Sequence, residues 1–270
     1  MRPALLAKTM GMEARKAMAY RADFWVEALF VFATEFGVAW FVWTAVFDAT
    51  GRETVGGLTR GAAFLYYALV ILVGKFVRGN EFGDAAVSQD IYEGGLTRYL
   101  LYPASYFGFK YAQHLGSLFP ALLQLVLFGV AAAFLLASAD VSLSAQSVAM
   151  GAVSVLAANL LYFLIGFPLH CVAFWADNVW SLSVAQRLVA QLLGGLLVPL
   201  SAWPAWAQEV LAWLPFRHLF WEPVMTVLGR RTPQEWGTNL LVALLWCAAF
   251  ALLGRLLFRR GSLRYSGVGI

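Results

Sequence analysis

Residues 192–229 read LLGGLLVPLSAWPAWAQEVLAWLPFRHLFWEPVMTVLG and contain two apolar segments, Ala202–Leu214 and His218–Leu228, separated by Pro215. As helices of about 11 to 13 residues, each would be under roughly 20 Å long. The hydrocarbon core of a bilayer is about 30 Å thick, so neither segment can span it. Both are too rich in Trp, Phe and Leu for a solvated loop. They predict a re-entrant or interfacial helical hairpin, residues 201–229.

The rest of the chain has the composition of a polytopic membrane protein. Hydrophobic residues make up 61% of its 270 residues and charged residues only 13%, whereas soluble domains carry about 25% charged residues. We expect one all-α membrane domain, residues 1–270, with the hairpin between the fifth and sixth of six spans. The predicted spans are Phe24–Phe47, Leu58–Val77, Gly108–Ala137, Val148–Trp175, Ser183–Leu200 and Gly237–Phe258.

Residues 1–22 have neither the apolar run nor the cleavage site of a signal peptide. Their apolar residues recur at helical spacing, while Lys8 and Arg15 fall on the opposite face. We therefore expect an amphipathic helix in the membrane interface. The apolar face of this N-terminal helix comprises Leu6, Met10, Ala14, Ala17 and Met18.

Pro120 is expected to kink the third span.

The distribution of positive charge predicts the orientation. If both termini are cytoplasmic, about fourteen of the 19 Lys and Arg residues lie on that side, as the positive-inside rule requires. The hairpin then lies outside. The same distribution explains the pI of about 9.2 without nucleic-acid binding.

Residues 84–102, here called the docking segment, connect the second and third spans on the cytoplasmic side. Asp84 suits the start of a helix because a carboxylate there complements the helix dipole. Gly94 and Gly95 are expected to end that helix, and an amphipathic turn follows before Pro103. A short helix presented to the cytoplasm suits docking of another protein, but an ordinary interfacial connector has the same pattern.

The chain carries no pattern for a nucleotide, metal or catalytic site. It lacks a GxxxxGK[ST] loop, so ATP-driven work requires a separate subunit. No HExxH or GxSxG pattern accompanies the three histidines, which we interpret as hydrogen-bonding residues. Cys171 and Cys247 lie in apolar runs and suggest neither a metal nor a disulfide.

Two acidic residues, Glu27 and Glu35, fall within the first span. An acid near the bilayer centre costs about 2.5–3.5 kcal/mol and must face protein or water. Lys75 is a candidate partner for Glu27, and no basic residue is expected at the depth of Glu35. Glu35 lies either on a polar substrate path or at a subunit seam, or it is a structural acid. The candidate polar residues around it are Gln124, Asn159 and Gln191.

Arg217 is an unexpected charge within the hairpin. It either anchors the hairpin through Glu222 or Glu209, or it extends its guanidinium to the outer headgroups. We favour the anchoring role.

Several segments together resemble the ABC-2 type export permeases. EGGLTRYLLYPAS at Glu93–Ser105 is similar to the EGxLxxYLLxP segment of that family. AFWADN at Ala173–Asn178, GGLLVPLSAWPAWAQEVLAWLPF at Gly194–Phe216 and the run WEPVMTVLG resemble further segments of its bacterial branch of roughly 260 residues. The basic ending RRGSLRYSGVG is similar as well. A departure is Glu222, which stands where more neutral aromatic residues are expected.

The resemblance implies a permease subunit in the bacterial cytoplasmic membrane. It would dimerise with itself or a sister permease, and two separate ATP-binding subunits would hold ATP and Mg and drive export of a drug, antibiotic peptide, lipid or lipid-linked glycan. The residues implied to contact the ATPase are Asp84, Val87, Gln89, Asp90, Ile91, Tyr92 and Glu93. The predicted path or seam comprises Glu35, Asn159 and Gln191. The predicted outer gate comprises Trp203, Trp206, Trp213, Phe216, Arg217, Phe220 and Trp221.

Two other functions are weaker alternatives. A membrane-embedded lipid-modifying enzyme would need an acid–base or metal constellation that the sequence lacks. A stand-alone proton-coupled carrier or channel would rest on Glu35 alone.

Overall fold

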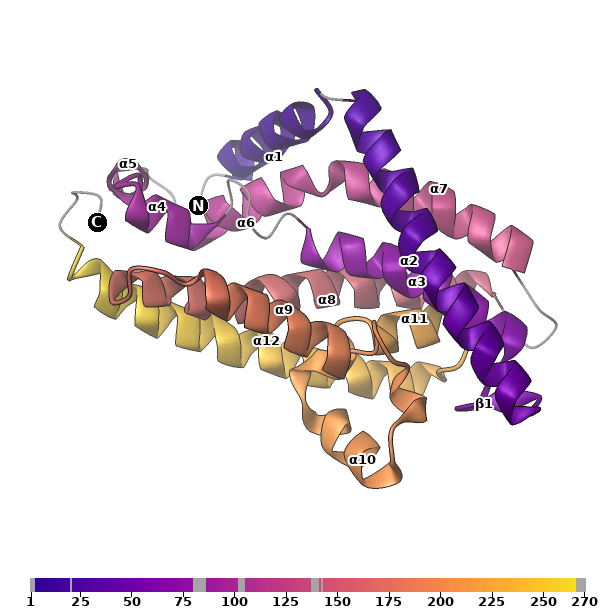
Figure 1. The fold of residues 1–270 in the computed structure, drawn as a ribbon. Helices are drawn as coiled ribbons and strands as arrows, with labels where there is room; N and C mark the ends of the chain where they lie inside the picture. Colours follow the sequence, from indigo (N-terminus) through magenta and orange to yellow (C-terminus); the bar gives the residue numbers. More distant parts are fainter. Residues whose placement is uncertain are drawn as a thin grey trace.

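The computed structural model describes residues 3–19, 21–79, 86–101, 105–136, 141 and 143–265. Helices form almost all of this part of the chain (Figure 1). The long helices are α1 (Pro3–Ala17), α2 (Arg21–Thr50), α3 (Arg60–Arg78), α6 (Tyr106–Ser117), α7 (Phe119–Leu136), α8 (Ala145–Cys171), α9 (Trp180–Leu193) and α12 (Pro233–Ser262).

Shorter elements connect them. The short helices are α4 (Val87–Tyr92), α5 (Leu96–Leu100), α10 (Ala205–Trp213) and α11 (Trp221–Val227), with 3₁₀ turns η1 (Val172–Phe174), η2 (Leu200–Ala202) and η3 (Pro215–His218). The antiparallel strands β1 (Thr54–Val55) and β2 (Leu58–Thr59) form a small hairpin. Gly56 and Gly57 make its turn with positive φ angles of 58° and 74°, which glycine adopts without steric cost.

The core of the molecule lies around α3. This helix contacts α2, α7 and α8, while α8 also contacts α11 and α12. Nearly all of α3 is buried, including Leu65, Tyr66 and Val70. The Tyr66 hydroxyl donates to the Gly195 carbonyl at 2.5 Å, which ties α3 to the segment after α9. Burial of α3 on all sides explains why its sequence is apolar around the whole helix.

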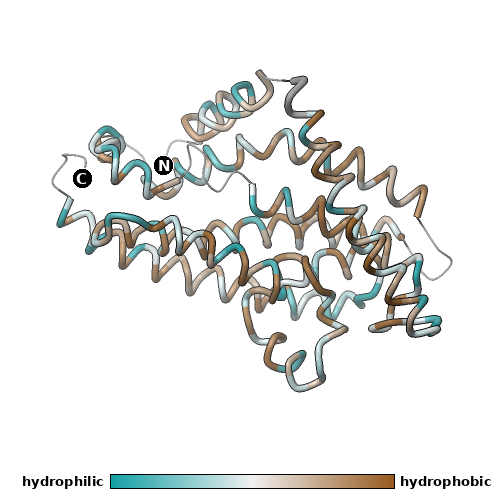
Figure 2. Tube along the Cα trace, viewed as in Figure 1, coloured by the Kyte–Doolittle hydropathy of each residue, from teal (hydrophilic) through white to brown (hydrophobic). Residues whose placement is uncertain are grey.

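Five of the described helices are long and apolar enough to cross a membrane: α2 from Trp25, α3, α7, α8 and α12. Figure 2 shows hydrophobic residues along α2, α7 and α12. The fifth predicted span, Ser183–Leu200, corresponds to α9, which has 14 residues and is about 21 Å long. The structure therefore confirms a helical fold with several candidate membrane spans, but not the count of six.

The third predicted span is divided into two helices. α6 ends at Ser117 and α7 begins at Phe119, directly before Pro120. Proline lacks the N–H that a residue in the helix interior uses for its hydrogen bond. It is therefore favoured in the first turn, where that N–H would have no partner within the helix. The predicted interruption is confirmed, and it frees α6 to pack against α1. α1 and α6 meet closely at Gly116, where an added Cβ would lie 2.5 Å from the Met10 carbonyl oxygen.

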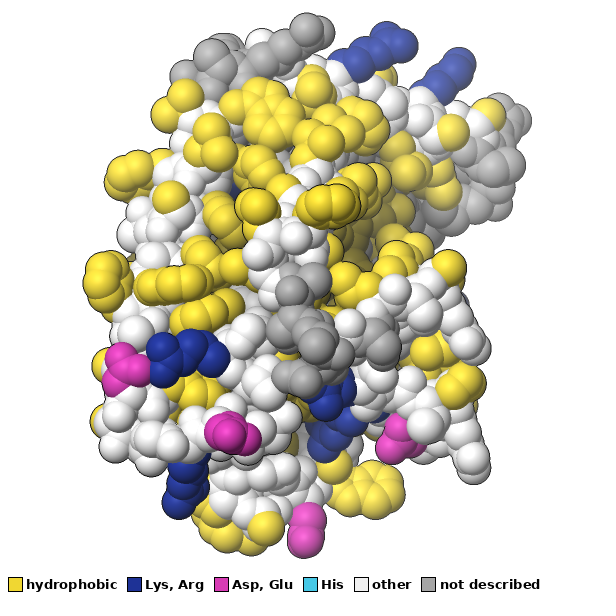
Figure 3. Space-filling model, turned by 90° about the vertical axis from the view of Figure 1, so that its right-hand side faces the viewer, with side chains coloured by type: hydrophobic (Ala, Val, Ile, Leu, Met, Phe, Trp, Pro, Cys, Tyr) yellow, Lys and Arg dark blue, Asp and Glu magenta, His cyan; other side chains and the backbone are white. Residues whose placement is uncertain are grey.

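The two ends of the helix bundle carry different elements. In Figure 1, α4 and α5 lie at the same end as the beginning of α1 and the end of α12, while β1 lies at the opposite end. Figure 3 views that opposite end. Hydrophobic side chains cover much of its upper part, acidic side chains lie in its lower part, and Lys and Arg side chains lie both at its top and in its lower part.

The hairpin at residues 201–229 has two unequal arms. α10 projects from the bundle (Figure 1), and its Trp206 and Trp213 are 70% and 76% exposed. α11 is buried against α8 and α3. Both helices are shorter than the predicted segments, because Pro204 and Pro215 delimit α10 and η3 precedes α11. Only the α10 arm therefore remains available for contacts outside the chain.

Candidate functional site

A buried ion pair fixes the docking segment to the bundle. Lys110 Nζ of α6 lies 2.6 Å from Asp90 Oδ2 of α4, and the lysine side chain is fully buried. The Tyr106 hydroxyl donates to the same carboxylate oxygen at 2.6 Å. Lys110 also lies 4.9 Å from the centre of the Tyr99 ring, in a cation–π contact. The ion pair and the Tyr106 hydrogen bond therefore join α4 to α6.

Further contacts join α4 to α8 and η1. Ser88 Oγ lies 2.9 Å from His170 Nδ1 of α8, and the Tyr92 hydroxyl donates to the Ala176 carbonyl at 3.0 Å. α4 ends just before Gly94 and Gly95, as the sequence predicts, and Gly94 has a φ of 73°. The docking segment is thus joined to both α6 and α8.

These contacts correct part of the predicted docking surface. Ile91, Val87 and Asp90 are buried at 0%, 2% and 7% exposure, so they cannot contact another protein without unfolding α4. The hydrophobic side of this short amphipathic helix faces its own bundle. Gln89 and Glu93 are exposed.

The exposed surface of the docking segment extends into α5. Leu100 and Leu101 are 50% and 82% exposed, and Tyr92 is half-buried. Asp84 lies outside the described residues. The sequence pattern alone did not distinguish Leu100 and Leu101 from the apolar residues that face the bundle.

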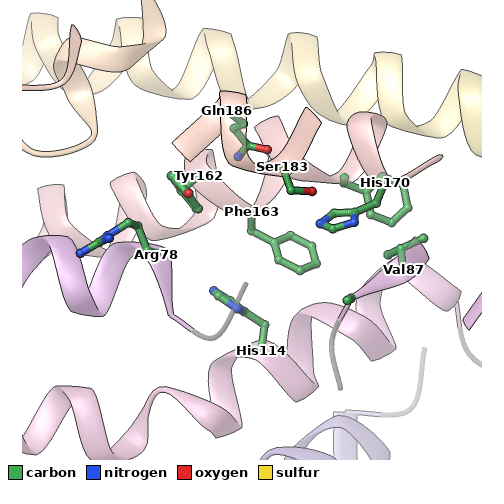
Figure 4. Close-up of a pocket in the computed structure, with 11 residues that line it drawn as sticks. Arg78, Val87, His114, Tyr162, Phe163, His170, Ser183 and Gln186 are labelled. Carbon is green, nitrogen blue, oxygen red and sulfur yellow. The ribbon is translucent and has the colours of Figure 1, made fainter. Parts of the chain in front are cut away.

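A small cavity lies where α4 meets the helix ends. It has a volume of about 50 Å3, enough for water but not for a drug-sized molecule. His114 of α6 and His170 of α8 both point into it (Figure 4). The lining residues are Arg78, Ala86, Val87, His114, Tyr162, Phe163, Gly166, Phe167, His170, Ser183 and Gln186. The cavity thus lies at the contact between the docking segment and the spans and is too small to bind a substrate.

A larger cavity of about 270 Å3 lies among α2, α3, α7 and α9 and contains Glu27 and Glu35. Lys75 lines it as well. That no basic residue lies at the depth of Glu35 stays a prediction, although Lys75 lines the same cavity.

The other predicted path residues lie elsewhere. Asn159 of α8 is 1% exposed, and its Nδ2 lies 3.3 and 3.2 Å from the carbonyl oxygens of Phe76 and Val77. It also lies 3.0 Å from His114 Nε2. Asn159 thus ties the end of α3 to α8 and α6. Neither Asn159 nor Gln191 lines the cavity that contains Glu35.

The buried arm of the hairpin is fixed by Glu222, whose side chain is 4% exposed. Arg217 Nε donates to Glu222 Oε1 at 2.6 Å, and Arg231 Nε donates to Oε2 at 2.7 Å. Asn239 of α12 donates to Oε2 at 2.9 Å. The predicted anchoring of Arg217 through Glu222 is confirmed. Burial alone would raise the pKa of Glu222, but the hydrogen bonds and charges of Arg231 and Arg217 outweigh it and lower the pKa.

The predicted gate residues separate into two groups. Trp206 and Trp213 are exposed on α10, and Trp203, Phe216 and Arg217 are half-buried. Phe220 and Trp221 are buried at 0% and 4%, and the Trp221 ring lies 5.3 Å from that of Tyr66. Their aromatic surface therefore packs against the core.

We expect acid to destabilise the hairpin through His218, which is 3% exposed. Burial lowers its pKa from 6.5 to about 4, although Glu222 opposes the shift. The neutral imidazole therefore stabilises the fold above pH 6.5, and this contribution is lost as pH falls to about 4, by at most about 1.4 kcal/mol per pH unit. Thermal unfolding in detergent at pH 7 and pH 4.5 measures this loss of stability. His218→Gln should show a smaller change between these pH values, and an equal change in both proteins would contradict the assignment.

Within the described residues, no group of three or more His, Cys, Asp or Glu side chains is placed to hold a metal ion. Cys171 and Cys247 are both buried free thiols. These residues serve packing between helices.

Comparison with protein families identifies the class of this membrane protein. A family model described as ABC-2 family transporter protein matches residues 33–269. The chain belongs to the ABC-2 transporter family. It is therefore the permease type of subunit of an ABC transporter, and members of the ABC-2 family carry no ATPase site of their own. Membership also implies partnership with an ATP-binding subunit. Searches of curated proteins and of solved structures found no match.

Proposed function

We propose that this chain is the permease subunit of an exporter that moves an amphipathic or lipid-like substrate out across the bacterial cytoplasmic membrane. ATP hydrolysis on a separate subunit, which holds ATP and Mg, drives the transport. Two permeases, identical or sister chains, form the membrane unit. α9 and residues 194–200 together make the remaining crossing, so that both termini are cytoplasmic and α1 lies in the membrane interface.

The observation that carries this proposal is the attachment of the docking segment. α4 is joined to α6 by the buried Asp90–Lys110 pair and to α8 by the Ser88–His170 contact. Gln89, Glu93 and Leu101 remain exposed on the other side. An ATPase that binds this exposed surface would move α6 and α8 as it opens and closes. The projecting α10 arm serves as the outer gate, in contact with the second permease or the outer leaflet.

Reversal of an exposed charge tests the docking surface. A tagged chain purified from cells that express its ATPase should carry that subunit in a ratio of about 1:1, with measurable ATP hydrolysis. Glu93→Arg should reduce the bound ATPase at least about fivefold, because a partner surface that complements the acid would meet a like charge, at a cost of roughly 1 kcal/mol or more. Ile91, which is fully buried, is unsuitable for this test.

The matched control is Glu209→Arg, which reverses an exposed acid on α10 and should leave the ATPase bound. ATPase binding that persists in Glu93→Arg would show that the subunit docks elsewhere. Robust transport by the purified permease without ATP would overturn the proposed function and favour a carrier built around Glu35.

A further inference from the structure

The cavity among α2, α3, α7 and α9 carries charges of both signs. Glu27 and Glu35 line it from α2, while Lys75 and Arg78 line it from α3 and Arg187 from α9. Both acids are exposed on the isolated chain, so the cavity is accessible from the α2 side. With about 270 Å3, it is large enough for a polar head group. A singly charged ligand would meet charges of its own sign on one of these walls.

Gln124 of α7 points to a missing hydrogen-bond acceptor. Its side chain lines the cavity and is 2% exposed. Among the described residues, nothing accepts a hydrogen bond from its Nε2. A buried donor without a partner costs about 1–3 kcal/mol, and such groups in folded proteins are nearly always satisfied by protein, water or ligand. Lys75, Arg78 and Arg187 line the same cavity, and an anionic group of a ligand held there can accept this hydrogen bond.

The remaining walls are apolar. They comprise Ala28, Val31, Phe32, Ile71, Leu72 and Phe128. Phe32 and Phe128 are in contact, with ring centroids 5.8 Å apart. Apolar surface beside fixed charges suits a molecule with both a charged head and a hydrocarbon part.

We propose that this cavity binds the head group of a zwitterionic amphiphile. Lys75, Arg187 and the Gln124 amide contact its phosphate-type anion, and Glu27 and Glu35 contact its ammonium group. The hydrocarbon part lies along the apolar walls. The site lies within one permease chain. That the bound amphiphile is also the transported substrate rests on the proposed function, whereas binding itself does not.

Two lipids that differ in one charge test the proposal. The purified full-length permease in uncharged detergent is titrated calorimetrically with short-chain phosphatidylethanolamine and with phosphatidylglycerol of identical acyl chains. We expect phosphatidylethanolamine to bind about tenfold more tightly, because a charge-assisted hydrogen bond contributes enough for that factor. The double variant Glu27→Gln/Glu35→Gln should remove the preference, since its cavity no longer distinguishes the amine.

The ratio of the two affinities is measured on one protein sample, so partial misfolding does not alter it. Gln124→Leu should weaken both lipids similarly, about tenfold, because both contain the phosphate. Glu209→Gln, an exposed acid outside the cavity, should change neither. Equal binding of the two lipids by the unchanged protein, or a preference that survives in the double variant, would overturn the proposal.

The result is separable from the proposed function. Selective lipid binding without ATP-driven export would leave the site intact and refute the transport role. ATP-driven export without selective binding would support the transport role and refute this site.

Discussion

Lys110→Met is expected to release the docking segment from the bundle. The variant removes the cation that lies 2.6 Å from Asp90 and leaves the buried carboxylate without that partner, while the Tyr106 hydroxyl still donates to it. Breaking one side of a buried ion pair costs about 3–5 kcal/mol. Amide hydrogen exchange in residues 86–101 should therefore accelerate by roughly a hundredfold or more, and the ATPase should no longer co-purify.

The double variant Lys110→Met/Asp90→Asn should recover much of the protection, because neither residue then carries an unpaired buried charge. Arg98→Met provides a matched control. Arg98 also lies over the Tyr99 ring, at 4.8 Å, but it is exposed, so its loss should cost less than about 1 kcal/mol. Unchanged exchange in Lys110→Met would show that the apolar contacts of Val87 and Ile91 hold α4 without the ion pair.

Glu222→Gln is expected to loosen the hairpin to a similar extent. It leaves Arg217 and Arg231 facing each other without the carboxylate that both contact. The lost charge also weakens the contact to Asn239 of α12. We expect a loss of about 3–5 kcal/mol, seen as a lower unfolding midpoint and as faster proteolysis within residues 214–232.

An exposed acid again provides the comparison. Glu209→Gln on α10 should leave both the midpoint and the proteolysis rate unchanged, because surface charges contribute little. Asn239→Ala should give an intermediate loss, because it removes one hydrogen bond and no charge. A Glu222→Gln protein as resistant as the unchanged chain would mean that the apolar contacts of Trp221 and Val224 fix the arm by themselves.

Local sequence chemistry predicted most helix positions but fewer of their contacts. Pro120 correctly marked the boundary between α6 and α7, and Gly94 marked the end of α4. These residues act through backbone conformation, which depends on near neighbours in the chain. The length of α9 was predicted less well, because the apolar run continues past Gly194 while the helix does not.

The candidate sites depended on contacts that no local pattern contains. Glu35 was recognised as costly in a membrane span, but the cavity that it shares with Lys75 became evident only from the packing of α2 against α3. Gln124 was named as a polar candidate, yet its unpaired donor is a property of the assembled cavity. Glu222 looked like a departure from a family pattern, and the fold shows it to be the anchor of Arg217.

The sequence by itself determined that this chain is a helical membrane protein, where most of its helices lie and which family it resembles. Composition, helix length and chain-breaking residues suffice for that, because the bilayer requires each span to satisfy its own backbone. Only the tertiary structure decided which faces are free. The docking segment buries Ile91 and exposes Leu101, and the hairpin buries α11 and exposes α10. The buried and the exposed residues are all apolar, so hydrophobicity does not distinguish them. Only packing against α6, α8 and α3 decides which are buried.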